Sequence, residues 1–183
     1  MNIRDIKTER CILRRTAWED RNNIFKILNN PKAIENLNMN LHLTLEDTDR
    51  LLDDYFLGIE NETKCPYTII DSNTGAFIGI FLLKLDLYNE DAFEFTVYLD
   101  EVFWGKGIYT EILPYMVTVA FDDIKTKNFR GYVMEKNVAS RKVLEKSEFI
   151  LEKVFNVPGI QDKIYSFLIT EEDYRKNIGV KYE

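Results

Sequence analysis

Cysteine, histidine and proline are scarce in this chain, which holds two cysteines, one histidine and four prolines among 183 residues. Cys11 and Cys65 form no disulfide framework, so we expect reduced, buried thiols of the kind found in cytosolic proteins. No His/Cys cluster has the spacing of metal ligands. The single histidine, His42, lies between Leu41 and Leu43 in a loop-like segment, which disfavours a catalytic Cys–His pair.

Long apolar runs and an excess of basic residues are also lacking. No stretch approaches the ~18 apolar residues of a membrane span, and the first residues carry no signal-peptide pattern. The chain has 24 Lys and Arg against 31 Asp and Glu, a net charge of −7, which disfavours nucleic-acid binding. This charge suits a cationic substrate such as an amine, although support of solubility is the preferred explanation. We expect a cytoplasmic protein that binds neither nucleic acid nor membrane.

Hydrophobic residues make up 45% of the chain and aromatic residues 13%, which predicts one folded domain over residues 1–183. Alternating or apolar β-rich runs predict strands over 10–15, 67–71, 76–84, 92–99, 129–134, 149–157 and 163–170. Apolar residues at helical spacing predict helices over 18–28, 45–60, 108–122 and 139–147, with an irregular segment at 31–43. This order predicts a mixed α/β fold in which the strands of 67–99 form an antiparallel meander.

The most informative stretch is Phe103–Glu111, Phe-Trp-Gly-Lys-Gly-Ile-Tyr-Thr-Glu, which joins a predicted strand to a predicted helix. Gly105 and Gly107 let the backbone approach a ligand closely, and the helix N-terminus favours an anion. The stretch therefore predicts a cradle for pyrophosphate. An ordinary tight turn is the alternative, and Thr110 at the third glycine position excludes a dinucleotide fingerprint.

A second element follows about thirty residues later, where Asn137 and Ser140 open a predicted helix after an apolar strand. Asn137 is a good helix N-cap, and Ser140 lies one turn further on. A capped surface helix packed on a sheet explains both residues without a ligand, and that alternative stays open.

Together the two elements resemble the GNAT superfamily of N-acetyltransferases. There the strand, the Gly-x-Gly loop and the helix bind acetyl-coenzyme A, and the Asn-x-x-Ser helix lies along the pantetheine. The resemblance runs from Glu9 to about Tyr174 and favours the ribosomal-protein-alanine N-acetyltransferase branch, through Glu9–Arg15, Trp104–Gly107 and Thr110-Glu111. It implies a mixed α/β fold whose central, mostly antiparallel, twisted sheet of about seven strands is flanked by helices.

The resemblance also implies a set of residues that bind acetyl-coenzyme A, the acetyl-donor substrate. Backbone groups of the fourth strand would hold the pantetheine and the thioester carbonyl, and backbone N–H groups of the loop would hold the pyrophosphate. Lys106 adds charge there or is simply a solvated loop lysine. The implied cofactor-binding residues are Val97, Tyr98, Leu99, Gly105, Lys106, Gly107, Ile108, Tyr109, Thr110, Asn137 and Ser140.

The chain departs from the superfamily at two informative positions. Tyr109 stands where glycine or alanine is usual, so its side chain must point away from the pyrophosphate or crowd it. Leu144 stands where the general-acid tyrosine is frequent, so that catalytic acid cannot be carried over.

Two residues are catalytic candidates. Glu94 lies between Phe93 and Phe95, where burial would raise its pKa and suit it to deprotonate the amine. Strand alternation gives the alternative that Glu94 faces solvent. Ser140 is the second candidate, as an aid to the leaving thiolate or, preferably, as a cofactor-positioning hydroxyl. Glu111 is expected to tie the loop to a neighbouring strand.

The sequence therefore predicts an acetyl-coenzyme A-dependent N-acetyltransferase that acts on a primary amine. A protein N-terminus is the favoured acceptor. A small amine, such as a polyamine, amino sugar or antibiotic, is the first alternative, and a non-catalytic acyl-coenzyme A-binding protein is the second. Because members of the superfamily are often dimers, a homodimer is also implied.

Overall fold

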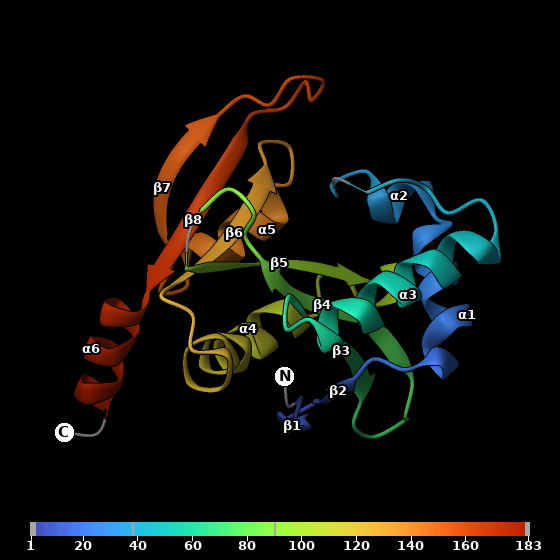
Figure 1. Cartoon of the computed structure of the whole chain (residues 1–183), viewed down its shortest axis with the longest axis horizontal. Helices are drawn as coiled ribbons and strands as arrows, with labels where there is room; N and C mark the ends of the chain where they lie inside the picture. Colours follow the sequence, from blue (N-terminus) through green and yellow to red (C-terminus); the bar gives the residue numbers. More distant parts are fainter. Residues whose placement is uncertain (1–2, 38, 90, 182–183) are drawn as a thin grey trace. The chain divides into compact units, whose positions relative to one another are not determined.

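A computed structural model describes residues 3–37, 39–89 and 91–181. The chain forms two compact units, one of residues 1–84 and 96–115 and the other of residues 85–95 and 116–183. Its strands follow the order β1-β2-β3-β4-β5-β6-β8-β7 in an eight-stranded, mostly antiparallel sheet. Strand β5 (Ala92–Leu99) and helix α4 (Ile108–Thr118) each contribute residues to both units (Figure 1).

The first unit contains a run of antiparallel strands, in which β2 pairs with β1 and β3, and β3 pairs with β4. Besides the end of β5, the strands of this unit are β1 (Ile6–Lys7), β2 (Cys11–Arg15), β3 (Lys64–Asp71) and β4 (Phe77–Leu85). Its helices are η1 (Trp18–Asp20), α1 (Arg21–Leu28), α2 (Pro31–Ile34), α3 (Leu45–Glu60), η2 (Glu101–Phe103) and the start of α4.

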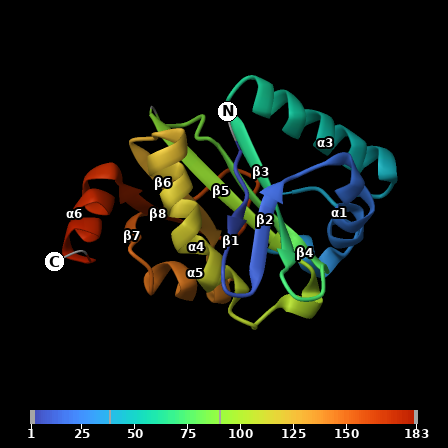
Figure 2. The same ribbon diagram turned by 90° about the horizontal axis from the view of Figure 1, so that it is seen from below.

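Helices α1 and α3 lie side by side and cover one face of the first unit's strands (Figures 1 and 2). Their apolar faces meet β4 and β5 in a core that contains Ile24, Leu52, Tyr55, Ile80 and Tyr98. Helix α3 starts at Leu45 as predicted, and the backbone N–H of Thr44 donates to the Asp47 carboxylate at 2.9 Å in a cap of its first turn. The hydrophobic stripe of the sequence is therefore the stripe that packs.

The second unit contains the parallel pairing of β5 with β6 and an antiparallel hairpin of β7 and β8. Its other elements are the π-helical turn Val119–Ile124, β6 (Asn128–Met134), α5 (Val138–Glu145), β7 (Ile150–Phe155), β8 (Ile164–Thr170) and α6 (Glu171–Lys181). Strand β8 lies between β6 and β7, so β7 is an edge strand, and Ile150, Leu151 and Val154 on it are exposed. Figure 1 shows the long β7–β8 hairpin running into α6.

An aromatic cluster forms the core of the second unit. The ring of Phe95 lies 5.0 Å from that of Phe129 and 5.8 Å from that of Phe149, between ring centroids. Phe121 stacks on Tyr174 at 4.9 Å and links this cluster to α6. Such tilted and stacked rings add to the stabilisation that burial already provides.

The predicted fold class is confirmed, with three corrections. The sheet has eight strands rather than about seven, because the two-residue strand β1 precedes the first predicted one. The segment 31–43, expected to be irregular, opens with α2, where Pro31 occupies the first turn and Asn30 caps the N–H of Lys32. The helix predicted to reach residue 122 becomes π-helical at Val119 and ends at Ile124, followed by Lys125, whose φ is 64°. The single domain over residues 1–183 stays a prediction.

The two cysteines and the single histidine all lie in the interior of the protein. Cys11 and Cys65 are both buried, as expected. His42 is also buried, and its Nδ1 lies 2.9 Å from Thr48 Oγ1. Burial lowers the pKa of His42 below its usual value. No metal-binding group of three or more His, Cys, Asp or Glu residues occurs in the described part of the chain.

Candidate functional site

The loop between β5 and α4 has the predicted strand–loop–helix form, within the first unit. Gly105 and Gly107 both adopt positive φ angles, 69° and 76°, which favour glycine over any residue with a side chain. A Cβ atom built at Gly105 would meet nothing within 4 Å, and one at Gly107 would meet only Arg10 Nη2, at 3.6 Å. The loop backbone is therefore open on its outer side. Backbone N–H groups in such a loop can bind an anion beside a helix N-terminus.

Side chains from both ends of the loop hold its shape. The indole Nε1 of Trp104 donates to the Leu99 carbonyl at 2.9 Å, and the Trp104 backbone N–H donates to the backbone carbonyl of Glu101 at 3.1 Å. The ammonium of Lys106 lies 5.5 Å from the Phe103 ring centroid and is exposed to solvent.

The first residues of α4 differ in exposure. Ile108 is buried, Thr110 is exposed and Tyr109 is half-buried. Burial raises the pKa of the Tyr109 hydroxyl above its usual value. The direction of this side chain relative to the pyrophosphate stays a prediction.

The residues predicted on β5 offer backbone rather than side-chain groups. Tyr98 is 3% exposed, and its hydroxyl lies 3.0 Å from that of Tyr55 in the core of the first unit. Burial raises the pKa of Tyr98 well above its usual value, so this phenol stays neutral. Val97 and Leu99 are half-buried. Only the main chain of Tyr98 remains for a ligand.

Glu111 in the first turn of α4 is tied to the turn between β1 and β2, as the sequence suggested. Its Oε1 accepts from Thr8 Oγ1 at 2.5 Å and from the Arg10 backbone N–H at 2.8 Å, and its Oε2 accepts from Arg10 Nε at 2.5 Å. Partial burial would raise the pKa of Glu111, but the hydrogen bonds from Thr8 and Arg10 outweigh it and lower this pKa. The carboxylate is therefore charged at neutral pH.

In the second unit, Asn137 caps helix α5. Its Oδ1 accepts a hydrogen bond from the Ser140 backbone N–H at 3.1 Å, and both side chains are half-buried. Asn137 therefore acts as the helix cap that the sequence analysis gave as the alternative. This cap uses neither the amide nitrogen of Asn137 nor the hydroxyl of Ser140. Leu144, at the position of the superfamily's tyrosine, is fully buried and packs near Gly131.

Glu94 lies between the two environments that the sequence allowed. Phe93 and Phe95 are buried, whereas Glu94 points to the opposite face of β5 and is half-buried. Its register partner on β6 is Arg130, so the two side chains share a face.

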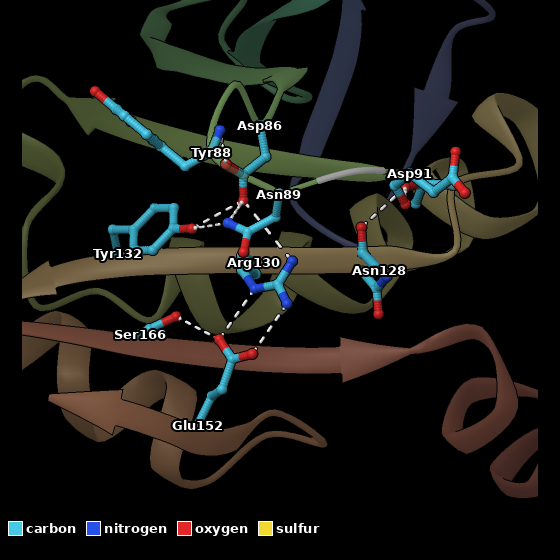
Figure 3. A network of polar contacts seen from close by, with 10 residues as sticks. Asp86, Tyr88, Asn89, Asp91, Asn128, Arg130, Tyr132, Glu152 and Ser166 are labelled. Carbon is cyan, nitrogen blue, oxygen red and sulfur yellow. Dashed lines mark hydrogen bonds and ion pairs between the residues drawn. The ribbon is translucent and has the colours of Figure 1, made fainter.

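That face of the second unit carries a polar network that the sequence reading missed (Figure 3). Arg130 points from β6 between two carboxylates, and its side chain is 8% exposed. Its Nε and Nη2 donate to Glu152 at 3.0 and 2.9 Å, and Ser166 donates to the same carboxylate at 2.9 Å. The only signal in the sequence was an arginine inside an otherwise apolar strand.

On the other side of Arg130, the carboxylate of Asp86 is completely buried. It accepts from Tyr132 Oη and Asn89 Nδ2, both at 2.8 Å, and from the Tyr88 backbone N–H at 3.0 Å. Arg130 Nη1 lies 3.8 Å from Asp86 Oδ2 and has no hydrogen-bond partner among the described residues. Burial, followed by the contact with Asp86, raises the pKa of Tyr132 far above its usual value.

A pocket of about 250 Å³ lies elsewhere in the second unit. It is lined by Leu85, Asp91, Ala92, Phe93, Ile124, Lys125, Thr126 and Lys127. None of the predicted site residues lines it, and it presents no thiol, imidazole or other activated nucleophile. We therefore do not assign the chemistry to this pocket. None of the helices that the structure describes is long and apolar enough to cross a membrane.

Known proteins share sequence and fold with this chain. A family model described as an acetyltransferase (GNAT) domain matches residues 10–150. The probable N-acetyltransferase YjcK of Bacillus subtilis (strain 168) is 28% identical over 114 residues, which are 62% of this chain and 63% of that protein. This chain therefore aligns with less than two thirds of that relative's length.

Solved structures share the fold. The ribosomal L7/L12 alpha-N-protein acetyltransferase RimL, in complex with coenzyme A, superposes with a TM-score of 0.79 at 19% identity, over 91% of this chain and 98% of that one. Spermidine N-acetyltransferase from Vibrio cholerae, in complex with coenzyme A and spermine, gives 0.78 at 17% identity, over 90% and 98%. At such identities the likeness concerns the fold.

Proposed function

Because the chain belongs to the GNAT acetyltransferase family, whose model matches residues 10–150, we propose that it transfers an acetyl group to a primary amine. Acetyl-coenzyme A is the acetyl donor and supplies the acetyl group as a thioester. The observation that carries the proposal is the loop before α4, with two positive-φ glycines and an open outer side. The pyrophosphate is assigned to the backbone N–H groups from Gly105 to Thr110.

The remaining cofactor contacts are assigned by residue. The main chain of Val97, Tyr98 and Leu99 is assigned to the pantetheine and the thioester carbonyl, and Asn137 and Ser140 to the pantetheine. Calorimetric titration of the purified protein with acetyl-coenzyme A, with free coenzyme A as the control, tests the assignment. Micromolar affinity supports it, whereas absence of binding to either ligand overturns the proposed function.

Asn137 needs a test that separates a ligand contact from a helix cap. Substitution to alanine removes both the cap and the amide, while Asn137→Ser retains a capping oxygen and loses only the amide. A ligand contact raises KM for acetyl-coenzyme A in both variants. If KM stays unchanged and only the melting temperature of Asn137→Ala falls, Asn137 is a cap and nothing more.

Glu94 is proposed as the general base that deprotonates the acceptor ammonium, directly or through a water molecule. Its half-buried position on β5 supports this role, because a carboxylate partly shielded from bulk solvent can accept a proton from an ammonium held next to it. The variant Glu94→Gln should lower kcat and remove the acidic limb of the pH–rate profile. Glu145→Gln, on the exposed part of α5, serves as the control. Unchanged turnover of Glu94→Gln across pH refutes the role.

Ser140 is proposed to position the cofactor rather than to protonate the leaving thiolate, because a hydroxyl is a weak acid without a relay. In that case Ser140→Ala raises KM for acetyl-coenzyme A more than it lowers kcat. The opposite split, a fall in kcat at constant KM, would instead assign the proton to Ser140.

The acceptor is proposed to be a protein N-terminus, with a small amine as the second candidate. The branch marks in the sequence, Glu9–Arg15 and Trp104–Gly107, support the first. The net charge of −7 also suits a polycationic small amine. A panel of N-terminal peptides, polyamines and aminoglycosides, assayed by release of free thiol, distinguishes them. Binding of acetyl-coenzyme A without turnover of any amine would favour a non-catalytic acyl-coenzyme A-binding protein. A cytoplasmic homodimer completes the proposal.

A further inference from the structure

The turn between β1 and β2 reaches the glycine loop through one side chain, Arg10. Its Nε is bound to Glu111, and its Nη1 donates to the backbone carbonyl of Lys106 at 2.8 Å. Nη2 lies 3.6 Å from the point where a Cβ of Gly107 would be. The planar guanidinium therefore holds the first turn of α4 and the middle of the loop at once, which a lysine ammonium cannot do in the same geometry.

The contact with Lys106 fixes the direction of a peptide group. In a trans peptide the C=O of Lys106 and the N–H of Gly107 point in opposite directions. Since Arg10 holds the carbonyl on its own side, the N–H of Gly107 must point to the other side. Gly105 and Gly107, on either side of Lys106, both have positive φ angles and leave the backbone free to turn. Without the hydrogen bond from Arg10, the Lys106–Gly107 peptide could therefore rotate. The Lys106 carbonyl oxygen would then point outward and repel an anion.

Glu111 in turn holds the arginine. Its two oxygens accept three hydrogen bonds from Thr8 and Arg10, so the guanidinium has little freedom to swing into solvent although its side chain is 43% exposed. An exposed ion pair of this kind contributes little to folding stability. Its value lies in orientation, because a preorganised loop loses less entropy when it binds a ligand.

We propose that Arg10 and Glu111 are positioning residues that preorganise the glycine loop for the pyrophosphate of the acyl donor. Arg10 aims the Gly107 N–H outward, its positive charge adds to the field at the loop, and Glu111 keeps the guanidinium in place. The proposal rests on the proposed function, in that the loop 105–110 binds pyrophosphate. Neither residue was among those predicted to bind the cofactor.

The test compares two acyl donors. Acetyl-coenzyme A contains the pyrophosphate, whereas S-acetylpantetheine carries the same thioester without it. In Arg10→Ala and Glu111→Gln we expect about tenfold weaker calorimetric affinity for acetyl-coenzyme A and a matching rise in KM. The value of kcat/KM for S-acetylpantetheine should stay within about twofold of the wild type. Arg10→Lys keeps the charge but not the planar fork, and should fall between wild type and Arg10→Ala.

The matched control is Arg175→Ala in α6. Arg175 is equally exposed, at 47%, and is likewise paired with a carboxylate, that of Asp122. This variant should bind acetyl-coenzyme A like the wild type. Melting temperatures of all variants are measured in parallel, so that a change in affinity can be compared with a change in stability.

Three results overturn the proposal. One is unchanged affinity of Arg10→Ala and Glu111→Gln for acetyl-coenzyme A with a lower melting temperature, since the residues would then be structural only. Another is an equal loss with both donors, because the pyrophosphate would not be involved. The third is failure of the wild type to bind coenzyme A, which removes the proposed function itself and is recognised before any variant is made.

Discussion

Replacing Arg130 with methionine should destabilise the protein strongly at neutral pH. The side chain is 8% exposed and lies between Asp86, which is completely buried, and Glu152, which is 26% exposed. Removing one partner of a buried ion pair costs about 3–5 kcal/mol, because the other charge stays behind without compensation. Asp86 keeps three hydrogen-bond donors and Glu152 keeps Ser166, so we expect the lower end of this range, about 3 kcal/mol.

The loss should depend on pH in a defined direction. The hydrogen bond from Arg130 lowers the pKa of Glu152 in the folded protein. A lowered folded-state pKa stabilises the fold above the unfolded-state pKa of ~4.3, and this stabilisation is lost as the pH falls through the folded value. The difference between wild type and Arg130→Met should therefore be complete at pH 7 and shrink below about pH 4.

Urea unfolding at pH 7, 5 and 3.5 measures the difference, and thermal unfolding should show a shift of roughly 6–12 °C for a chain of this size. Combining Arg130→Met with Glu152→Gln in a double-mutant cycle isolates the coupling between the two side chains. Arg175→Ala, which breaks an exposed pair, should cost less than about 1 kcal/mol. A loss below 1 kcal/mol for Arg130→Met, or a loss of equal size at pH 7 and 3.5, would refute the reasoning.

Two further changes test the first unit. A Cβ atom at Gly79 would lie 2.2 Å from the backbone oxygen of Tyr98, so Gly79→Ala should lower the free energy of unfolding in urea by about 3 kcal/mol. At Gly75 only the positive φ of 72° opposes a side chain, so Gly75→Ala should lower it by about 1 kcal/mol. Because burial lowers the pKa of His42, the unfolded chain binds more protons than the folded one just below pH 6.5, so stability should rise with pH up to that value. His42→Asn should remove this slope, and an unchanged slope would exclude His42 as its source.

Local signals in the sequence were enough to predict most of the elements. The alternation of 92–99 and the apolar spacing of 45–60 predicted β5 and α3 with their observed ends. The glycine loop was likewise readable, since only glycine adopts positive φ freely at Gly105 and Gly107. Family membership followed from the same loop together with Asn137 and Ser140.

Contacts between distant residues could not be read in the same way. Arg130 and Glu152 meet because β8 inserts between β6 and β7, and no periodicity reveals that order. Glu111 was expected to tie the loop to a strand, but its partners Thr8 and Arg10 lie about a hundred residues earlier in the chain. Helix α2 and the π-helical turn after α4 depend on one turn of backbone each, which is too short for a hydrophobic pattern.

The long separation between Arg10 and Glu111 has a consequence during protein synthesis. The two residues are 101 positions apart, so roughly 5–20 s pass between their incorporation at typical rates of chain elongation. Until Glu111 has been made, the β1–β2 turn has no carboxylate to bind, although its own short-range pairing can already form. The tie between the β1–β2 turn and the first turn of α4 therefore forms only after residue 111 has been made. A nascent chain stopped before residue 111 would carry the early strands without an ordered anion cradle.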